Sequence, residues 1–188
     1  MASIGHHPAG TRPGRVSKLK TDRLCLKEAT VGDNRRIQRI FASNPSFLSL
    51  RRDIADSPTG YDLESVARYC ETAMFDAARH LLIAVDKSSG DPIGLIDFVE
   101  VSPADGHPWI GLILVGGQHH RQGYGSEMVR AICRRLKSTG KADVRVAVLE
   151  DNQPGRDFLE RLGFSPYDAA AISTTPESGP AILMQKEL

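Results

Sequence analysis

The chain has 188 residues, of which 40% are hydrophobic and 25% charged, and its formal net charge is +1 at pH 7. This length and apolar content suffice for one well-buried core, so we expect a single domain. The near-neutral charge and scattered basic residues exclude a nucleic-acid footprint, and no apolar run approaches the roughly 20 residues that cross a bilayer, so neither nucleic acid nor a membrane is an expected partner.

The cysteines indicate the cellular compartment, and the first residues indicate where the folded domain begins. Cys25, Cys70 and Cys133 are odd in number, widely separated and set among apolar residues. This pattern favours buried, reduced thiols in a cytoplasmic protein and gives no metal-binding spacing. Residues 1–15 are rich in Gly, Pro, His and Arg and lack the apolar segment of a signal peptide, so we expect a disordered tail at 1–18 ahead of a folded domain at 19–188.

The first third of the chain predicts one strand and two helices. Leu24 and Leu26 mark a short strand. Asp33 can cap a helix that ends before Pro45, because the residue ahead of a proline disfavours helical geometry. A second helix begins at Asp62, and its apolar residues recur along one side.

The centre of the chain predicts three strands. Residues 81–85 and 93–101 are apolar runs joined by turn-forming residues at 88–91, an arrangement typical of a hairpin. The run at 109–115 is almost wholly apolar, as expected of a strand covered on both faces.

The last third predicts two more helices, each followed by a strand. One helix begins at Gln122 and leads to a strand of alternating valines at 144–148. The other begins at Asn152, which precedes a proline in the first turn, and the chain then resumes as strand at Phe164. A final strand covers 181–184. This alternation predicts an α/β domain with a mixed sheet.

The junction after the strand at 109–115 has the features of a phosphate-binding loop, since Gly123 and Gly125 lie where the strand gives way to a helix. The first N–H groups of a helix have no internal partners and the helix dipole adds positive charge, so main chain alone can hold a diphosphate there. Two common loops are excluded: Met128 stands at the third glycine of the dinucleotide motif, and the P-loop lysine is missing.

The loop and two further segments together resemble the sequence motifs of one protein family. The segment His120–Gly125 resembles the acyl-coenzyme A loop of the GNAT superfamily of N-acetyltransferases: Arg or Gln, two residues, Gly, any residue, then Gly or Ala. Val148–Phe164 resembles the family's second signature of strand, Asn, helix and Leu-Gly-Phe. With a Thr-Asp-Arg-Leu-x-Leu opening at 21–26, the resemblance covers roughly residues 19 to 188.

Three positions depart from the family pattern. His120 stands in place of the first Arg or Gln, and Arg121 restores a cation one residue later. Gly155 stands where the family usually has Ala. Leu159 stands where many members have the Tyr that gives a proton to the departing thiolate, and Tyr167 or a bound water could replace it.

The resemblance implies helices on both faces of the sheet and two splayed strands that admit pantetheine. It implies acetyl transfer from acetyl-coenzyme A, the co-substrate, to a primary amine of a small molecule or a protein N-terminus, by direct attack in a ternary complex. The opening residues loosely resemble the branch that modifies ribosomal-protein N-termini. The implied coenzyme-binding residues are Leu114, Val115, Gly116, Arg121, Gln122, Gly123, Tyr124, Gly125, Ser126, Asn152 and Phe158.

The catalytic acids are harder to place. Family members often carry a Glu on the strand before the loop, but 109–114 has no acid, and the nearest candidates are Asp97 and Glu100 on the preceding strand. Their odd spacing predicts opposite faces. Asp97 is either a functional acid or a structural carboxylate paired with Arg, whereas Glu100, near a strand end, is more often solvated.

The missing strand Glu and helix Tyr also leave an alternative function, a catalytically inactive sensor that binds acyl-coenzyme A. The expected partner is an amine-bearing acceptor, and whether the chain also forms a homodimer is left open. The resemblance places the acceptor wall at roughly 43–62 and in the segment before the last strand.

Overall fold

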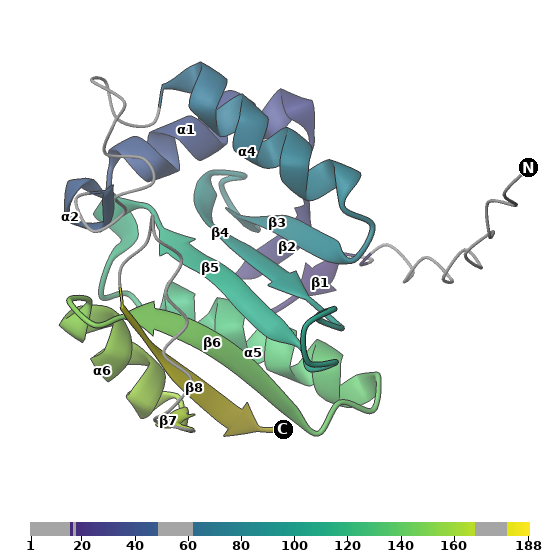
Figure 1. The fold of residues 1–188 in the computed structure, drawn as a ribbon. Coiled ribbons are helices and arrows are strands. Elements are labelled where there is room, and N and C mark those ends of the chain that lie inside the picture. The colour runs from purple at the N-terminus through teal and green to yellow at the C-terminus, as the bar shows by residue number, and fades with distance from the viewer. Residues whose placement is uncertain (1–15, 17, 49–61, 168–179) are drawn as a thin grey trace, which may run out of the picture.

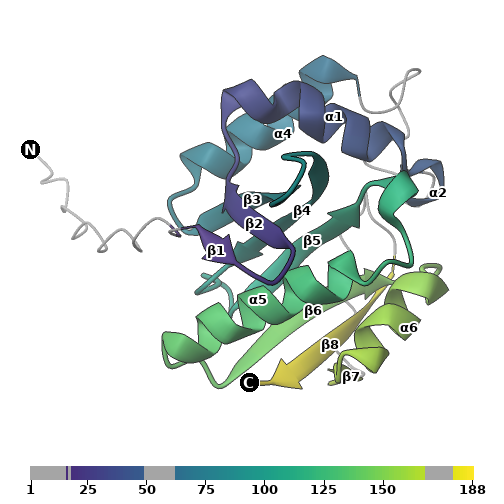
Figure 2. The ribbon, with the colours of Figure 1, turned by 180° about the vertical axis from the view of Figure 1, so that it is seen from behind.

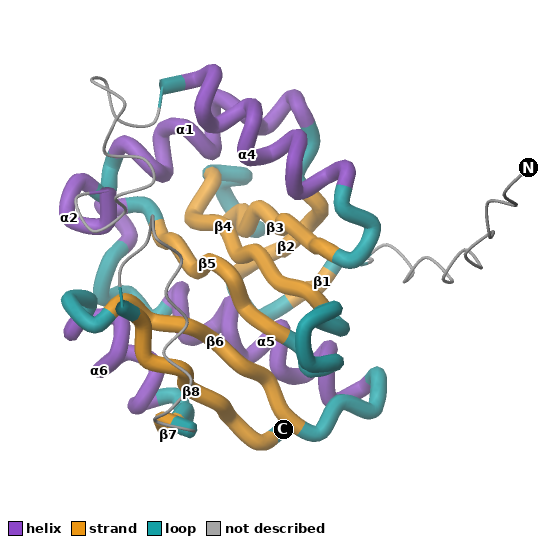
Figure 3. Tube along the Cα trace, in the orientation of Figure 1, coloured by secondary structure: helices purple, strands orange, loops and turns teal. Residues whose placement is uncertain are grey.

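An eight-stranded mixed sheet runs through the centre of the molecule (Figures 1 and 3). The computed structural model describes residues 16, 18–48, 62–167 and 180–188. Neighbouring strands are antiparallel except for the parallel pair β5 and β6. In spatial order the strands are β1 (Leu19–Lys20), β2 (Leu24–Glu28), β3 (Arg79–Asp86), β4 (Pro92–Val99), β5 (Trp109–Val115), β6 (Asp143–Leu149), β8 (Ala181–Glu187) and β7 (Ser165–Pro166).

Helices cover both faces of this sheet. Figures 1 and 2 show α1 (Asn34–Ala42) and α4 (Leu63–Phe75) on one face, and α5 (Tyr124–Ser138) and α6 (Gln153–Arg161) on the other. Each face of the sheet has its own apolar core. On one face, Phe41 of α1 and Leu95 of β4 are buried in the same cluster; on the other face, Phe98 of β4 and Met128 of α5 are buried together. The predicted α/β class, with helices on both faces of a mixed sheet, is confirmed.

The predicted elements are all present, with small shifts at their ends. The helix expected from Gln122 begins at Tyr124, because Gly123 has a left-handed backbone with φ of 82° and serves as the N-cap. The strand expected from Phe164 is limited to β7. Elements missed from the sequence are short: β1, α2 (Pro45–Leu48) and the 3₁₀ turns η1 (Val31–Asp33) and η2 (Gly117–His119).

The N-terminal tail expected at 1–18 lies mostly outside the described residues. Val16 is described, and its side chain is only 4% exposed within the core shared by β2 and α5. Its N–H donates to Glu28 Oε1 at 3.3 Å. The packed part of the chain therefore includes Val16, ahead of the expected boundary.

The two parallel strands separate soon after they meet. β5 and β6 pair only at Trp109 with Arg145 and at Ile110 with Val146, after which β6 continues against β8 and β5 against β4. The register between β4 and β5 shifts at this point: Asp97 lies opposite Leu112 and Phe98 opposite Ile110, so Gly111 is the extra residue of a β-bulge. The splayed strands expected from the resemblance are confirmed.

Candidate active site

A cleft opens between β5 and β6 where their pairing stops. Its volume is about 150 Å³, and its walls are mostly apolar. Apolar walls with a few amide groups suit a slender chain that carries amides of its own, such as pantetheine. The lining residues are Phe47, Ile110, Gly111, Leu112, Ile113, Val146, Ala147, Val148, Leu149, Asn152, Gly155, Phe158 and Leu159.

The glycine-rich loop forms a cradle at the start of α5. The N–H groups of Tyr124, Gly125 and Ser126 find no acceptor among the described residues and belong to the first helical turn, where the dipole favours an anion. A Cβ on Gly125 would lie 3.3 Å from the Phe158 ring, so the cradle packs closely against α6. The structure therefore brings Phe158 to the cradle.

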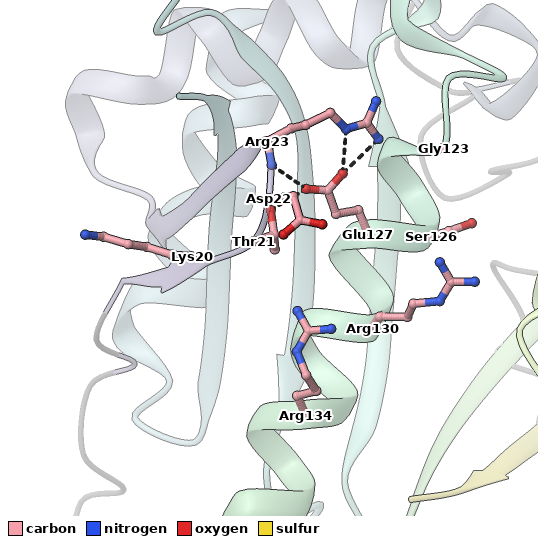
Figure 4. Close-up of a pocket in the computed structure, with 9 residues that line it drawn as sticks. All are labelled: Lys20, Thr21, Asp22, Arg23, Gly123, Ser126, Glu127, Arg130 and Arg134. Atoms are coloured by element: carbon pink, nitrogen blue, oxygen red, sulfur yellow. Dashed lines mark hydrogen bonds and ion pairs between the residues drawn. The ribbon is translucent and has the colours of Figure 1, made fainter. Parts of the chain in front are cut away.

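Arg23 and Glu127 brace this cradle from the side of β2. The Arg23 N–H donates to Glu127 Oε1 at 2.9 Å and its Nε to Oε2 at 2.8 Å, while the Thr21 hydroxyl also donates to Glu127 (Figure 4). The Arg23 guanidinium donates to the Gln122 carbonyl at 3.0 Å and lies 4.1 Å from the centre of the Tyr124 ring. We call this set the Arg23–Glu127 clamp; it ties the opening Thr-Asp-Arg motif to the phosphate loop.

The clamp predicts an acid-dependent loss of stability. Burial alone would raise the pKa of Glu127, but hydrogen bonds from Thr21 and Arg23, and the charge of Arg23, lower it below the usual value. A lowered pKa in the folded state stabilises the fold above the unfolded-state pKa of about 4.3, and this contribution is lost as pH falls through the folded pKa. Glu127→Gln should therefore cost about 1 kcal/mol at pH 7, since solvent partly screens Arg23.

Urea unfolding at several pH values measures this effect. The difference between wild type and Glu127→Gln should shrink as pH falls below about 4. A difference that stays constant from about pH 7 to about pH 3 would mean that the clamp does not depend on the ionised carboxylate.

Main-chain groups at the end of β5, where the resemblance places part of the coenzyme site, already have partners within the protein. The Gly116 N–H donates to Ile93 at 2.8 Å, and its carbonyl accepts from His119 at 2.8 Å. The Val115 carbonyl accepts from Asn44 Nδ2 at 3.0 Å and lies 2.9 Å from His120 Nε2. The main chain of Gly116 and the carbonyl of Val115 thus form hydrogen bonds within the protein, and their part in binding pantetheine stays a prediction.

Other predicted coenzyme residues surround the cradle. Leu114 buries its side chain beneath α1 and α4, which leaves only its main chain at the edge of β5. Arg121 is exposed and is the only described residue other than glycine with a positive φ, 61°. Gln122 is exposed and donates to the Gln118 carbonyl at 3.0 Å. Tyr124 lies between Arg23 and His119, and Ser126 is half-buried.

Asn152 faces the cleft from the start of α6. Its Oδ1 accepts from the Gly155 N–H at 3.0 Å, a side-chain N-cap, and its Nδ2 makes no hydrogen bond with any described residue. A Cβ on Gly155 would lie 2.5 Å from that Nδ2. Glycine at 155, the departure from the family pattern, thus makes room for the Asn152 amide.

Asn152→Asp separates the two roles of this side chain. Aspartate is an equally good N-cap, so thermal stability should be unchanged or slightly higher. The variant loses the Nδ2 donor, and affinity for acetyl-coenzyme A should fall about 10-fold. Calorimetric titration and thermal denaturation measure both effects; unchanged affinity would show that Asn152 acts only as a cap.

Asp97 lies at the bulge, in a small chamber next to the cleft. The chamber has a volume of about 240 Å³, is also lined by Tyr69, Arg79 and Trp109, and shares Gly111 with the cleft. Asp97 is 3% exposed. It accepts from Arg79 Nε at 2.9 and 2.8 Å and from the Tyr69 hydroxyl at 2.7 Å. Asp97 is therefore paired with an arginine, as one of the two alternatives expects, and it also lies next to the cleft, where a functional acid would be needed.

Charge and burial raise the pKa values of two residues that contact Asp97. Burial, followed by the adjacent carboxylate, raises the pKa of Tyr69 well above its usual value, so its hydroxyl stays a hydrogen-bond donor. The hydrogen bond with Asp97 raises the pKa of Arg79 despite partial burial. Asp97, Arg79 and Tyr69 therefore form a buried, electrically balanced cluster.

Glu100 faces the other way, as its spacing from Asp97 predicts. It forms an ion pair with Arg135 of α5, with Nε and a terminal nitrogen each 3.1 Å from Oε1. The expectation that it is solvated is wrong: it is 8% exposed, because α5 covers the end of β4. Glu100 does not line the cleft or the Asp97 chamber.

Tyr167, one of the two expected substitutes for the missing helix Tyr, lies away from the cleft. Leu159 occupies that position and is buried in the core at 4% exposure. The guanidinium carbon of Arg145 lies over the Tyr167 ring, 4.6 Å from the ring centre, and Tyr167 does not line the cleft. Within the described ranges, no three His, Cys, Asp or Glu side chains gather as metal ligands would.

Comparisons with known proteins agree with this geometry. Residues 47–164 match the family model described as Acetyltransferase (GNAT) family, so the chain belongs to the GNAT acetyltransferases. No curated protein matches the sequence.

Solved structures share the fold at low sequence identity. An acetyltransferase from Thermus thermophilus is 20% identical with a TM-score of 0.73, covering 92% of this chain and 100% of that one. RimL, a ribosomal L7/L12 α-N-protein acetyltransferase in complex with coenzyme A, is 12% identical with a TM-score of 0.73, covering 92% and 98%. PaiA N-acetyltransferase from Thermoplasma acidophilum, also with coenzyme A, is 14% identical with a TM-score of 0.65, covering 88% and 99%.

Proposed function

We propose that this protein transfers an acetyl group from acetyl-coenzyme A to a primary amine, on a small molecule or a protein N-terminus, in a ternary complex. The observation that carries the proposal is the short β5–β6 pairing, which opens beyond Ile110 onto a cleft that leads toward the phosphate cradle. The diphosphate would lie on the cradle and pantetheine along the free edge of β5. A main-chain N–H at Ile113 or Leu114 would stabilise the oxyanion that forms at the thioester carbonyl.

The amine must lose a proton to react, because a free alkylamine has a pKa near ~10. We infer that the amine reaches the thioester through the Asp97 chamber, which adjoins the cleft at Gly111. Asp97 then accepts the proton directly or through water. The nitrogen forms a bond to the acyl carbon, the carbon–sulfur bond breaks, and the thiolate takes a proton from water, since Tyr167 lies elsewhere.

Two observations favour a second candidate, an acyl-coenzyme A sensor without catalysis. Asp97 is already paired with Arg79, and Leu159 replaces the family's proton donor. A sensor needs the cradle and the cleft but no free acid, so its coenzyme affinity would resemble that of the enzyme.

The partner that we propose is the amine-bearing acceptor, and whether a second copy of the chain also binds is left open. Residues 49–61, most of the expected acceptor wall, lie outside the described residues. We propose a cytoplasmic location because Cys25, Cys70 and Cys133 are free thiols. None of the described helices is long and apolar enough to span a membrane.

Turnover of acetyl-coenzyme A with a panel of amines, read out as thiol release, tests the proposal. Small amines, free amino acids and short peptides with free N-termini should be included. We expect release that depends on one class of amine and is lost in Gly123→Asp. Coenzyme binding without release across the panel would favour the sensor instead, and the absence of binding would contradict both candidates.

A further inference from the structure

The end of α1 lies against the end of β5 (Figures 1 and 2), and two side chains join them. The hydroxyl of Ser43, the C-cap of α1, accepts the Gly117 N–H at 2.9 Å and donates to the Ile40 carbonyl at 2.8 Å. Asn44 Nδ2 donates to the Val115 carbonyl at 3.0 Å and to the Ile40 carbonyl at 2.7 Å. We call these two side chains the Ser43–Asn44 latch.

The latch has a closely fitted geometry. Asn44 is 6% exposed, so its amide is shielded from water and depends on partners within the protein. A Cβ on Gly117 would collide with the Ser43 carbonyl, so glycine is needed for the loop to come this close to α1. The burial of Asn44 and the missing Cβ of Gly117 indicate a contact with one fixed arrangement.

The latch holds β5 at the point where the strand has lost one neighbour. Beyond Ile110, β5 continues to pair with β4 but not with β6. A strand edge without a partner needs other contacts to keep its orientation. The Val115 carbonyl, held by the latch, follows closely after Ile113 and Leu114, whose N–H groups would stabilise the oxyanion.

The same latch also anchors one wall of the cleft. The chain passes directly from Asn44 into α2, and the Asn44 carbonyl accepts the Phe47 N–H at 3.1 Å. Phe47 lines the cleft. The latch therefore fixes two parts of the cleft relative to each other, the free edge of β5 and the Phe47 side chain.

We propose that Ser43 and Asn44 are positioning residues for acetyl transfer, because they hold the end of β5 and the Phe47 wall in the geometry that the reaction needs. An error of about 1 Å in such geometry can cost about 100-fold in rate. The cradle at 124–126 is a separate part of the site, so loss of the latch should slow the reaction more than it weakens coenzyme binding. The proposal rests on the proposed function.

Ser43→Ala tests the first half of the latch by removing the acceptor of the Gly117 N–H. We expect kcat to fall about 10-fold, while the KM for acetyl-coenzyme A stays within about twofold of wild type. Ser43→Thr keeps the hydroxyl and should restore most of the rate. Ser138→Ala is the matched control, because the Ser138 hydroxyl donates to the Arg135 carbonyl at 2.7 Å as Ser43 does to Ile40. It should keep the wild-type kcat.

Asn44→Ala tests the second half. The Val115 carbonyl still lies 2.9 Å from His120 Nε2, and the Ile40 carbonyl still accepts from Ser43, so both carbonyls keep a partner and the variant should fold. We expect kcat to fall at least about 10-fold, with the affinity for coenzyme A near that of wild type. Thiol release with the most reactive amine of the panel, calorimetric titration with coenzyme A and melting temperatures measure these effects.

A wild-type kcat in both Ser43→Ala and Asn44→Ala would overturn the proposal while leaving the proposed function intact. A Ser43→Thr variant as slow as Ser43→Ala would contradict the role of the hydroxyl. A loss of coenzyme affinity as large as the loss of rate would also overturn the proposal, because the latch would then act on binding. If wild type releases no thiol with any amine, the proposed function fails, and this proposal fails with it.

Discussion

Gly123→Asp should lower the affinity for acetyl-coenzyme A by about 100-fold. Gly123 has a φ of 82°, a conformation that costs residues with a Cβ about 1–2 kcal/mol, so we expect the loop of the unliganded variant to relax and to recover this strained geometry only when the coenzyme binds. The new Cβ would lie 3.5 Å from a terminal nitrogen of Arg23, so the carboxylate adds a negative charge beside the cradle, with at least about 1 kcal/mol of repulsion from the diphosphate at close range even in water. Since about 1.4 kcal/mol corresponds to tenfold, the two effects together give the expected loss.

Matched variants separate strain from charge. Gly140 lies just beyond the end of α5 with a φ of 80°, and a Cβ there would meet nothing within 4 Å. Gly140→Asp should therefore carry the same backbone strain but bind coenzyme normally. Gly123→Ala adds the strain without the charge and should fall between wild type and Gly123→Asp. Normal affinity in Gly123→Asp would remove the cradle from the coenzyme site.

Asp97→Asn should both destabilise the fold and change the pH dependence of acetyl transfer. Removing one partner of a buried ion pair costs about 3 kcal/mol, and Asp97 is 3% exposed with Arg79 and Tyr69 bonded to it. If Asp97 accepts the proton of the amine, the variant loses this acceptor, and the shape of the pH–rate profile should change. Chemical unfolding and initial rates from about pH 5 to about pH 9 measure the two effects.

Glu100→Gln is the control for this experiment. It disturbs a buried carboxylate–arginine pair of the same kind, on the opposite face of β4. It should cost stability while the shape of the pH–rate profile stays that of wild type. If Asp97→Asn also retains the wild-type profile, its carboxylate only positions Arg79 and Tyr69, and the proton leaves by another route.

Periodicity and local capping rules predicted most of the fold. Asp62 caps α4 through Ser65 N–H at 2.7 Å, and Asn152 caps α6, both as their sequence contexts indicate. The hairpin between β3 and β4 turns at Gly90, whose φ is 76°. Such features depend on residues within one or two turns of each other, so the sequence displays them directly.

Two features missed from the sequence, α2 and the β-bulge, depend on contacts that are distant in sequence. α2 has only four residues, too few to be stable alone, and follows Asn44, whose amide reaches the Val115 carbonyl across the fold. The bulge at Gly111 is a property of how β5 pairs with β4. No local pattern predicts either feature.

The candidate site likewise contains some features that are local in sequence and others that depend on distant residues. The phosphate loop and Asn152 could be placed from their motifs, because both are local to a helix N-terminus. The clamp joins Arg23 to Glu127, 104 residues apart, and the Asp97 cluster draws Tyr69 from α4 and Arg79 from β3. The sequence marked Asp97 as a charge that needs a partner, but only the structure identifies that partner.

The crystal structure of the protein with acetyl-coenzyme A tests the central claim most directly. We predict the diphosphate within hydrogen-bond distance of the N–H groups of Tyr124, Gly125 and Ser126, with pantetheine between β5 and β6 beyond Ile110. A coenzyme bound elsewhere, or strands β5 and β6 paired along their whole length with the coenzyme outside, would contradict this account.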